Sequence, residues 1–443
     1  MLIFFSFISS LLLYLVFYDI YLAIIVGIMI YLTGFLIFKS IHSFAFRELA
    51  LLLYAINYLL SPAITYAFDS IDNSFPMKIA SDRYFALAIP GFIFFTIGMY
   101  SIKTKCFGID IGKINKLSLF NEKFLKNILF VTICVKLSRD FVQGELAFIF
   151  YLIGLLRYVA AFSLFSINNK RNIIYPLMVC LLDLYGAFVA GAYHDSLMWL
   201  IFFALFYIYS TKPKVIKIIA IGFVAAILIL SVQAIKYKYR ADVWAGGDKE
   251  ANIENAISIG GGQLNREIVF GSENLFQTLN RANQAWIFAS TVENMDRTKD
   301  FQGLTNVSRY FEASLLPRFL APNKLRSGEN TLFNKFSGHL INDNTSMGLG
   351  VFADGYIAYG SMGVYVFGFA LGLIFAITFK IIEKWSDFSP YYALLLLPIL
   401  NFAIRPDGEL LTTLNHLFKS ILLYSMLVYL SRKRFTLASV TNS

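Results

Sequence analysis

The feature that most constrains this chain is its succession of apolar stretches, because a transmembrane helix needs about 20 mostly apolar residues. Twelve stretches of the 443-residue chain approach this length. They cover residues 2–18, 20–38, 48–68, 84–102, 125–138, 145–166, 173–191, 196–210, 215–235, 350–381, 388–404 and 409–430. Only 15% of the residues are charged, against about 25% in soluble domains. We therefore predict an all-α polytopic membrane protein with about twelve transmembrane helices.

The lysines and arginines between these stretches predict how the chain is oriented. Short cytoplasmic loops carry an excess of these residues. If both termini are cytoplasmic, eighteen of them fall in cytoplasmic segments and five in the short outer loops. The five are Lys78, Arg83, Lys136, Arg139 and Arg405. The formal net charge of +10 is then a signal of orientation, and no nucleic-acid partner is expected.

One long segment interrupts the series of apolar stretches. Residues 236–345 contain no predicted span, and they fall on the outer side in this orientation. Apolar residues from Ile268 to Ile287 recur at helical spacing. We predict nine spans in residues 1–235, a large helical outer loop in residues 236–345, and three spans with a short cytoplasmic tail in residues 346–443.

Arginine is the main candidate binding residue in this loop, because its planar fork of donors matches phosphate oxygens. The loop holds seven arginines. They are Arg240, Arg281, Arg309, Arg266, Arg297, Arg318 and Arg326. They favour a lipid-linked phosphate or pyrophosphate as the ligand, with solvent or lipid headgroups as the alternative contacts.

A second candidate is the short outer turn from Arg405 to Glu409, which has the sequence Arg-Pro-Asp-Gly-Glu. In one interpretation Arg405 forms a closed pair with a carboxylate of the turn. In the other, Arg405 binds phosphate, and Glu409 or Asp407 acts as a base.

Ionisable residues within apolar stretches are candidates for function by default. Asp354 lies in a glycine-rich stretch near the outer face, and His339 lies shortly before it. A histidine near neutral pKa can act as a general base. For the other three such residues we expect structural ion pairs. They are Arg157, Asp183 and Lys419. No motif for a metal, ATP or NAD is present, so we expect no cofactor.

Two stretches of the loop resemble Wzy-type oligosaccharide repeat-unit polymerases, the family of O-antigen and enterobacterial common antigen polymerases. Asp300-Phe-Gln-Gly-Leu304, followed by Val307-Ser-Arg309, is similar to a segment of the common-antigen branch. Arg281 and Arg240 match arginines that precede that segment.

Two later stretches carry the same resemblance. Residues 344–363 resemble a glycine-rich pattern of the family, with Asp354 at its acidic position. The Arg405 turn resembles an arginine-containing outer turn before the last span. The chain departs from the family at Pro406, and at Asn344, where the common-antigen branch has histidine.

This resemblance implies a bundle similar to GT-C glycosyltransferases and O-antigen ligases. Such an enzyme joins undecaprenyl-pyrophosphate-linked oligosaccharides at the periplasmic face of the bacterial inner membrane, without a metal. The implied catalytic residues are His339, Asp354 and Glu409, and the pyrophosphate ligands are Arg240, Arg281, Arg309 and Arg405. The implied partners are the lipid-linked substrates, the bilayer, a chain-length regulator and a flippase.

Three other functions stay open at this point. An O-antigen ligase would use the same donor. A transporter or flippase of lipid-linked sugars would carry charged residues along several spans. A structural membrane subunit would carry partners on its loop.

Overall fold

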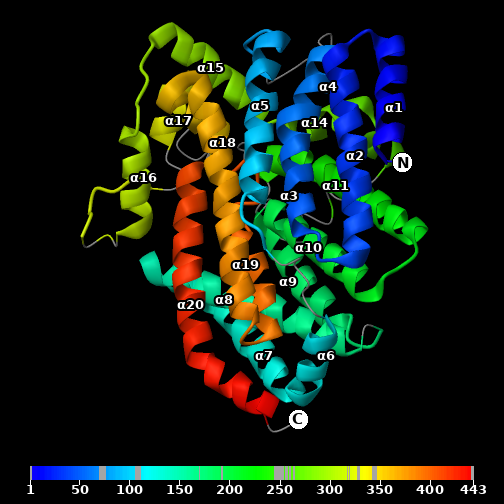
Figure 1. Cartoon of the computed structure of the whole chain (residues 1–443), viewed down its shortest axis with the longest axis vertical. Helices are drawn as coiled ribbons and strands as arrows, with labels where there is room; N and C mark the ends of the chain where they lie inside the picture. Colours follow the sequence, from blue (N-terminus) through cyan, green and yellow to red (C-terminus); the bar gives the residue numbers. More distant parts are fainter. Residues whose placement is uncertain are drawn as a thin grey trace. The chain divides into compact units, whose positions relative to one another are not determined.

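The computed structural model describes residues 2–68, 76–104, 111–168, 170–190, 193–243, 254, 258, 261–262, 265–316, 318, 320–326, 330–341 and 347–440. These residues form helices and no β-strand (Figure 1). The chain divides into two compact units. Unit 1 comprises residues 1–36, 45–107 and 282–443, and unit 2 comprises residues 37–44 and 108–281.

Unit 1 contains the N-terminal helices and the C-terminal third of the chain. Its helices are α1 (Leu2–Phe17), α2 (Ile20–His42) as far as Leu36, α3 (Phe46–Ala55), the π-helical turn η1 (Ile56–Leu60), α4 (Ser61–Ala67), α5 (Ser81–Tyr100), α15 (Ala285–Thr298), α16 (Thr305–Leu315), α17 (Asn330–Ser337), α18 (Val351–Ser386), the 3-10 helix η3 (Pro390–Leu395), α19 (Leu396–Leu400) and α20 (Leu410–Val440).

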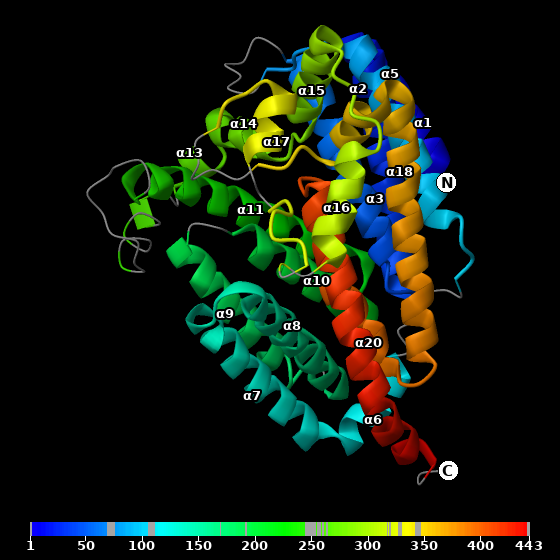
Figure 2. The same ribbon diagram turned by 90° about the vertical axis from the view of Figure 1, so that its left-hand side faces the viewer.

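Unit 2 contains the middle of the chain. Its helices are α6 (Ile111–Phe120), α7 (Glu122–Ser138), the 3-10 helix η2 (Arg139–Phe141), α8 (Gly144–Ile167), α9 (Ile174–Ala190), α10 (His194–Thr211), α11 (Val215–Val243), α13 (Arg266–Val269) and α14 (Ser272–Arg281). Helices α7 and α8 pack side by side along their length (Figure 2).

The apolar helices make the chain a helical membrane protein. Each of the twelve apolar stretches lies on one helix or on consecutive helices. Six helical segments among the described residues are long and apolar enough to cross a membrane. They are Ile20–His42, Phe46–Ala67, Ser81–Tyr100, Gly144–Ile167, Val215–Lys236 and Val351–Ser386.

The segment predicted as one outer loop, residues 236–345, is divided between the two units. Residues up to Arg281 belong to unit 2, and residues from Ala282 onward belong to unit 1. Unit 1 also takes residues from both sides of this segment. The boundaries of the two compact units therefore differ from the boundaries of the three ranges predicted from the sequence, 1–235, 236–345 and 346–443.

Prolines interrupt two of the membrane-spanning segments of unit 1, and tyrosines compensate for them. Pro62 near the start of α4 cannot donate a hydrogen bond to the carbonyl of Tyr58, four residues earlier. The hydroxyl of Tyr84 donates to that carbonyl at 2.8 Å. Pro90 inside α5 leaves the carbonyl of Ala86 free in the same way, and the hydroxyl of Tyr365 donates to it at 3.2 Å. Within a bilayer, a backbone carbonyl that has lost its helical hydrogen bond needs another donor from the protein.

Small residues bring α5 and α18 into close contact in unit 1 (Figure 1). A Cβ atom at Gly368 would lie 2.6 Å from the carbonyl oxygen of Gly91. Cβ atoms at Gly98 and Gly372 would likewise overlap the backbone of the partner helix. Gly368 and Gly372 form a GxxxG pair, which permits backbones to approach closely in membranes. We call this contact the α5–α18 seam.

Candidate functional site

Asp354 is buried near the start of α18, with a relative exposure of 6%. The helix begins after Gly350, whose φ is +83°, and a Cβ atom at that position would lie 2.5 Å from the hydroxyl oxygen of Tyr58. Glycine is therefore required there both by the backbone conformation and by the close contact. This close packing at the start of α18 places Asp354 in the first turn of the helix, where its side chain is buried.

Two donors from different helices satisfy the carboxylate of Asp354. The hydroxyl of Tyr310 on α16 donates to Oδ1 at 2.9 Å, and the backbone amide of Leu410 donates to Oδ2 at 3.4 Å. Leu410 is the first residue of α20, and α16 lies against α20 (Figure 2). Helices α16, α18 and α20 thus meet at one carboxylate.

The Arg405 turn leads directly into this contact, because residues 405–409 immediately precede Leu410. Within the turn, Arg405 Nε lies 3.6 Å from Asp407 Oδ1, and the amide of Gly408 donates to the Arg405 carbonyl at 3.2 Å. Glu409 Oε1 accepts a hydrogen bond from the hydroxyl of Thr412 at 2.6 Å. The structure therefore contains the Arg405–carboxylate pair that one interpretation of the sequence expects, with Asp407 as the partner.

Residues from elsewhere in unit 1 support the turn. The carbonyl of Gly348 accepts a hydrogen bond from Gln284 Nε2 at 2.9 Å, and a Cβ atom at Gly348 would lie 2.8 Å from the amide nitrogen of Glu409. The hydroxyl of Tyr58 donates to the carbonyl of Pro406 at 3.3 Å. The glycine-rich stretch and the Arg405 turn are therefore packed together, as parts of one site.

The electrostatic setting of Tyr310 matches its role as a donor. Burial raises the pKa of Tyr310, and the negative charges of Asp354 and Glu409 raise it further, while Arg309 opposes them. The hydroxyl therefore stays protonated and donates to Asp354. Asp354 is thus a buried carboxylate that lies between the hydroxyl of Tyr310 and a backbone amide, and Glu409 supplies a second carboxylate nearby. A carboxylate in this setting is a candidate proton acceptor.

His339 occupies a different place in unit 1. Its Nε2 lies 3.1 Å from the hydroxyl oxygen of Ser290, and its ring packs on Trp286 with centroids 5.4 Å apart. Both partners lie on one face of α15. Phe288, on the other face, contacts Phe352 of α18. The helix α15 thus separates His339 from the start of α18.

The predicted arginines are distributed over both units. Arg309 is exposed on α16, next to Tyr310. Arg240 lies on α11 and Arg281 ends α14, both in unit 2, and their side chains lie outside the described part of the chain. Asn344 also falls outside it. The predicted residues that the structure brings together are Asp354, Glu409 and Arg405, whereas Arg309 is linked to them only through Tyr310, its neighbour in the sequence.

A break in α18 lies just beyond Asp354. Tyr359 and Gly360 leave the helical conformation, and Gly360 has a φ of +58°. The amides of Gln302 and Gly303 donate to the carbonyls of Ile357 and Ala358 at 2.9 and 3.1 Å. The Asp300–Leu304 stretch therefore caps the first part of α18, instead of contributing a charged side chain to the site.

A network that the sequence did not indicate lies beside this cap. Tyr356 donates from its hydroxyl to Asp296 Oδ1 at 2.8 Å, and Arg83 forms an ion pair with the same carboxylate. Tyr356 lies in the glycine-rich stretch 344–363, but its presence there does not indicate its partners. Tyr310, Tyr58 and Gln284 were also missed, since nothing in a single sequence marks them as neighbours of Asp354.

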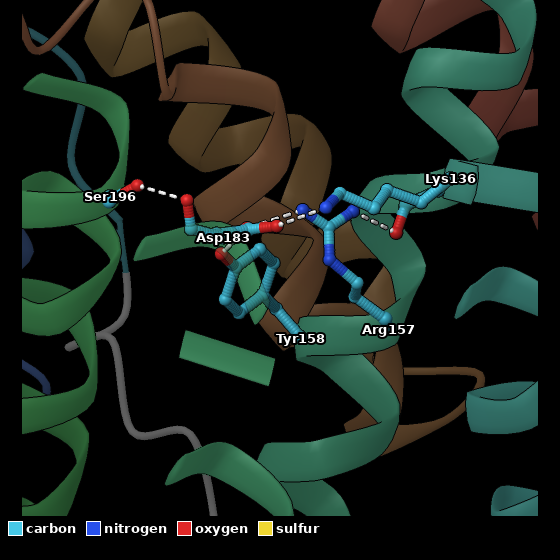
Figure 3. A network of polar contacts seen from close by, with 6 residues as sticks. Lys136, Arg157, Tyr158, Asp183 and Ser196 are labelled. Carbon is cyan, nitrogen blue, oxygen red and sulfur yellow. Dashed lines mark hydrogen bonds and ion pairs between the residues drawn. The ribbon is translucent and has the colours of Figure 1, made fainter. Parts of the chain in front are cut away.

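Structural ion pairs were expected for Arg157, Asp183 and Lys419, and the structure pairs the first two with each other in unit 2. Arg157 Nη2 donates to Asp183 Oδ2 at 2.5 Å (Figure 3). Lys419 lies on α20 in unit 1. Among the described residues, no group of three or more His, Cys, Asp or Glu is arranged to hold a metal ion.

Comparison with known proteins gives a match to a family. No curated protein and no solved structure matches the chain. Residues 25–394 match the family described as "Domain of unknown function (DUF8712)". This match covers most of the chain, including α18 with Asp354 and its break, and it ends before the Arg405 turn. The chain therefore belongs to the DUF8712 family.

Proposed function

We propose that the protein polymerises oligosaccharide repeat units carried on undecaprenyl pyrophosphate, at the periplasmic face of a bacterial inner membrane. One observation carries the proposal: a buried carboxylate, Asp354, is held by Tyr310 and by the backbone amide of Leu410, which directly follows the Arg405 turn. A candidate base and a candidate phosphate ligand thus share one site. The proposal includes twelve spans, a bundle similar to GT-C enzymes, and cytoplasmic termini.

In the proposed reaction, Asp354 accepts the proton of the attacking sugar hydroxyl. A new bond forms between that oxygen and the anomeric carbon of the donor, while the bond from this carbon to the pyrophosphate oxygen breaks. Undecaprenyl pyrophosphate leaves with the electron pair. Arg405 stabilises its charge, because donors that are positioned in advance act where charge develops. Arg240, Arg281 and Arg309 remain proposed ligands of the same group, and Glu409 assists Asp354.

The first experiment compares Asp354 with a carboxylate just beyond the other end of α18. Removing a general base costs about 10²- to 10⁴-fold in rate, so Asp354→Asn should lose long polymer from purified lipid-linked repeat units. The matched control is Asp387→Asn, at the residue that follows the last turn of α18, which should keep activity. Arg405→Lys should also lose long polymer if the guanidinium binds the leaving group in a bidentate way, through two N–H donors. Polymer of normal length from the Asp354→Asn variant would contradict this mechanism.

A transporter of lipid-linked oligosaccharides is the second candidate, and a specific observation favours it. Charged residues of α7, α8 and α9 meet in unit 2, around Asp183, as expected of a transporter with ionisable residues in several spans. Deletion of the gene, followed by gel display of the surface polysaccharide, separates the candidates. Single repeat units on the acceptor indicate a polymerase, and free polymer with a bare acceptor indicates a ligase. Units that stay on the cytoplasmic side indicate a transporter.

A further inference from the structure

A buried group of charged residues lies in unit 2, on helices α7, α8 and α9. Asp183 on α9 is its centre. Arg157 Nη2 lies 2.5 Å from Asp183 Oδ2, and Lys136 Nζ lies 3.4 Å from Asp183 Oδ1 (Figure 3). The hydroxyl of Tyr158 also donates to this carboxylate, and the hydroxyl of Ser196 on α10 donates to the backbone carbonyl of Asp183 at 3.0 Å. We call these five residues the Asp183 cluster.

The cluster holds more positive than negative charge. Lys136 and Arg157 are two cations against the single carboxylate of Asp183. The side chains of Arg157 and Asp183 are 6% and 11% exposed, and that of Lys136 is 26% exposed. Arg157 lies thirteen residues into Gly144–Ile167, a candidate membrane span. A surplus charge in such a place is costly unless a counter-ion compensates it.

The hydrogen bonding within the cluster is also incomplete. One nitrogen of the Arg157 guanidinium, Nη1, donates to the carbonyl of Gly154 at 2.6 Å, and Nη2 donates to Asp183. The third, Nε, is buried and has no hydrogen-bond partner in the part of the chain that the structure describes. Asp183 Oδ1 accepts no hydrogen bond there either, so Lys136 contributes only charge to this oxygen. Buried polar groups are normally satisfied.

There is space close to these groups. Gly186 follows Asp183 by three residues on α9 and so lies on a neighbouring part of the same helix face. Among the residues that the structure describes, a Cβ atom at Gly186 would have no other atom within 4 Å, apart from its own helix backbone and its neighbours in the chain.

We infer that the Asp183 cluster binds one phosphate group, through the ammonium of Lys136 and the Nε of Arg157. An oxyanion supplies the missing negative charge and accepts charge-assisted hydrogen bonds from both donors. Asp183 keeps the guanidinium in place and does not touch the ligand. The phosphate group belongs either to a soluble ion or to a lipid headgroup. This site lies outside the proposed catalytic site around Asp354 and does not depend on that proposal.

The test measures binding to the full-length protein in phosphatidylcholine nanodiscs. Two probes distinguish the sources: inorganic pyrophosphate added to the solution, and phosphatidic acid mixed into the bilayer. Saturable binding of either probe supports the site and identifies its source. Calorimetry gives the affinity for pyrophosphate, and the titration of phosphatidic acid is followed by tryptophan fluorescence.

Two lysine variants test whether the ligand binds at the Asp183 cluster. A hydrogen bond to a charged group contributes about 1.5–3 kcal/mol, so Lys136→Gln should weaken binding by roughly 10- to 100-fold. Lys126→Gln is the matched control, because Lys126 lies on the same helix and is paired with Glu122 at the surface. It should leave the affinity unchanged. Lys136 is partly exposed, so its substitution is compatible with folding.

Trp199 reports where the ligand binds. Its ring stacks on that of Tyr158 with centroids 3.6 Å apart, so a ligand at the cluster should change its fluorescence. Trp199→Phe should abolish this change, while Trp385→Phe, on α18, should keep it. Equal affinities of the Lys136→Gln and Lys126→Gln variants would overturn the inference. So would a fluorescence change that survives Trp199→Phe, or the absence of saturable binding of both probes at millimolar concentration.

Discussion

Tyrosine hydroxyls donate several of the buried hydrogen bonds inside unit 1. The hydroxyl of Tyr84 binds a carbonyl that Pro62 leaves free, and the hydroxyl of Tyr310 binds Asp354. In each case a large apolar ring is buried and its single polar atom finds a partner, which is the usual arrangement for a buried tyrosine. Substituting phenylalanine therefore tests one hydrogen bond while preserving the shape of the side chain.

Tyr310→Phe should slow polymerisation while the protein stays folded. The variant leaves Asp354 with only the amide of Leu410 as a described donor. Loss of a hydrogen bond to a charged group costs about 1.5–3 kcal/mol, which corresponds to roughly 10- to 100-fold in rate. The measurement is the initial rate with lipid-linked repeat units. The control is Tyr365→Phe, which removes a hydrogen bond to the backbone of α5; equal losses in the two variants would contradict a role for Tyr310 at the site.

His339 should make the stability of the protein depend on pH in the acidic range. Burial lowers the pKa of His339, and the charge of Lys78 lowers it further, with Glu293 opposing. The unfolded chain has the ordinary value of about 6.5 and so binds the proton more tightly than the native state. Stability is therefore unaffected above about pH 7.5 and falls as the pH drops through 6.5 and below.

The measurement is the thermal unfolding midpoint of the protein in detergent between pH 5 and 8, followed by tryptophan fluorescence. His339→Gln should reduce the loss of stability on acidification. His42→Gln, on α2, serves as the control. If His339→Gln leaves the pH dependence as it is in the wild type, another group is responsible for it.

Among the helices, α18 shows most clearly how far the sequence alone can predict this fold. The apolar stretch 350–381 predicted a helix, and the structure has one over Val351–Ser386. The break at Tyr359 and Gly360 was not predicted, because several glycines lie in this stretch, and of those inside the helix only Gly360 adopts positive φ. Its position depends on the amides of Gln302 and Gly303, which lie more than fifty residues away in the chain.

The same reasoning explains which parts of the candidate site were predictable. Asp354 and Arg405 stand out in the sequence because charge is rare in apolar surroundings. Tyr310 does not stand out, since a tyrosine on a half-buried helix is ordinary. The separation of His339 from Asp354 depends on α15 packing between them. Their closeness in sequence, fifteen residues, does not indicate this.

Gly360→Ala should destabilise the break in α18. The φ of +58° and ψ of −142° at Gly360 lie in a region that essentially only glycine occupies, and other residues pay about 1–3 kcal/mol there. The unfolding midpoint of the full-length protein should fall accordingly. Gly222→Ala on α11, where a Cβ atom meets no described residue within 4 Å, is the control and should be neutral or slightly stabilising. An equal midpoint for the two variants would show that the break is not strained.

On the scale of the whole molecule, the orientation of the chain is the prediction with the widest consequences. The excess of lysine and arginine in alternate loops predicts that residues near 340 face outward and residues near 214 face the cytoplasm. Leu340 is 90% exposed, and Lys214 lies between α10 and α11. Both positions suit chemical labelling.

A membrane-impermeant maleimide should label Leu340→Cys in intact cells and label Lys214→Cys only after the membrane is opened. Cys106, Cys134 and Cys180 are replaced by serine or alanine in the parent protein, since Cys134 is exposed. The control is labelling of both variants in permeabilised cells. Labelling of Lys214→Cys alone in intact cells would reverse the orientation and move the Asp354 site to the other side of the membrane.

The α5–α18 seam has a consequence for the order in which the protein is assembled. Tyr100 ends α5 and Val351 begins α18, so 250 residues separate the two helices in the chain. At a synthesis rate of about 5–20 residues per second, α5 waits roughly 12 to 50 seconds for its partner. During that time Gly91 and Gly98 lack their contacts with α18. The closest contact between these two membrane helices is therefore completed only late in synthesis, and any chaperone for the nascent chain would act on α5 during this interval.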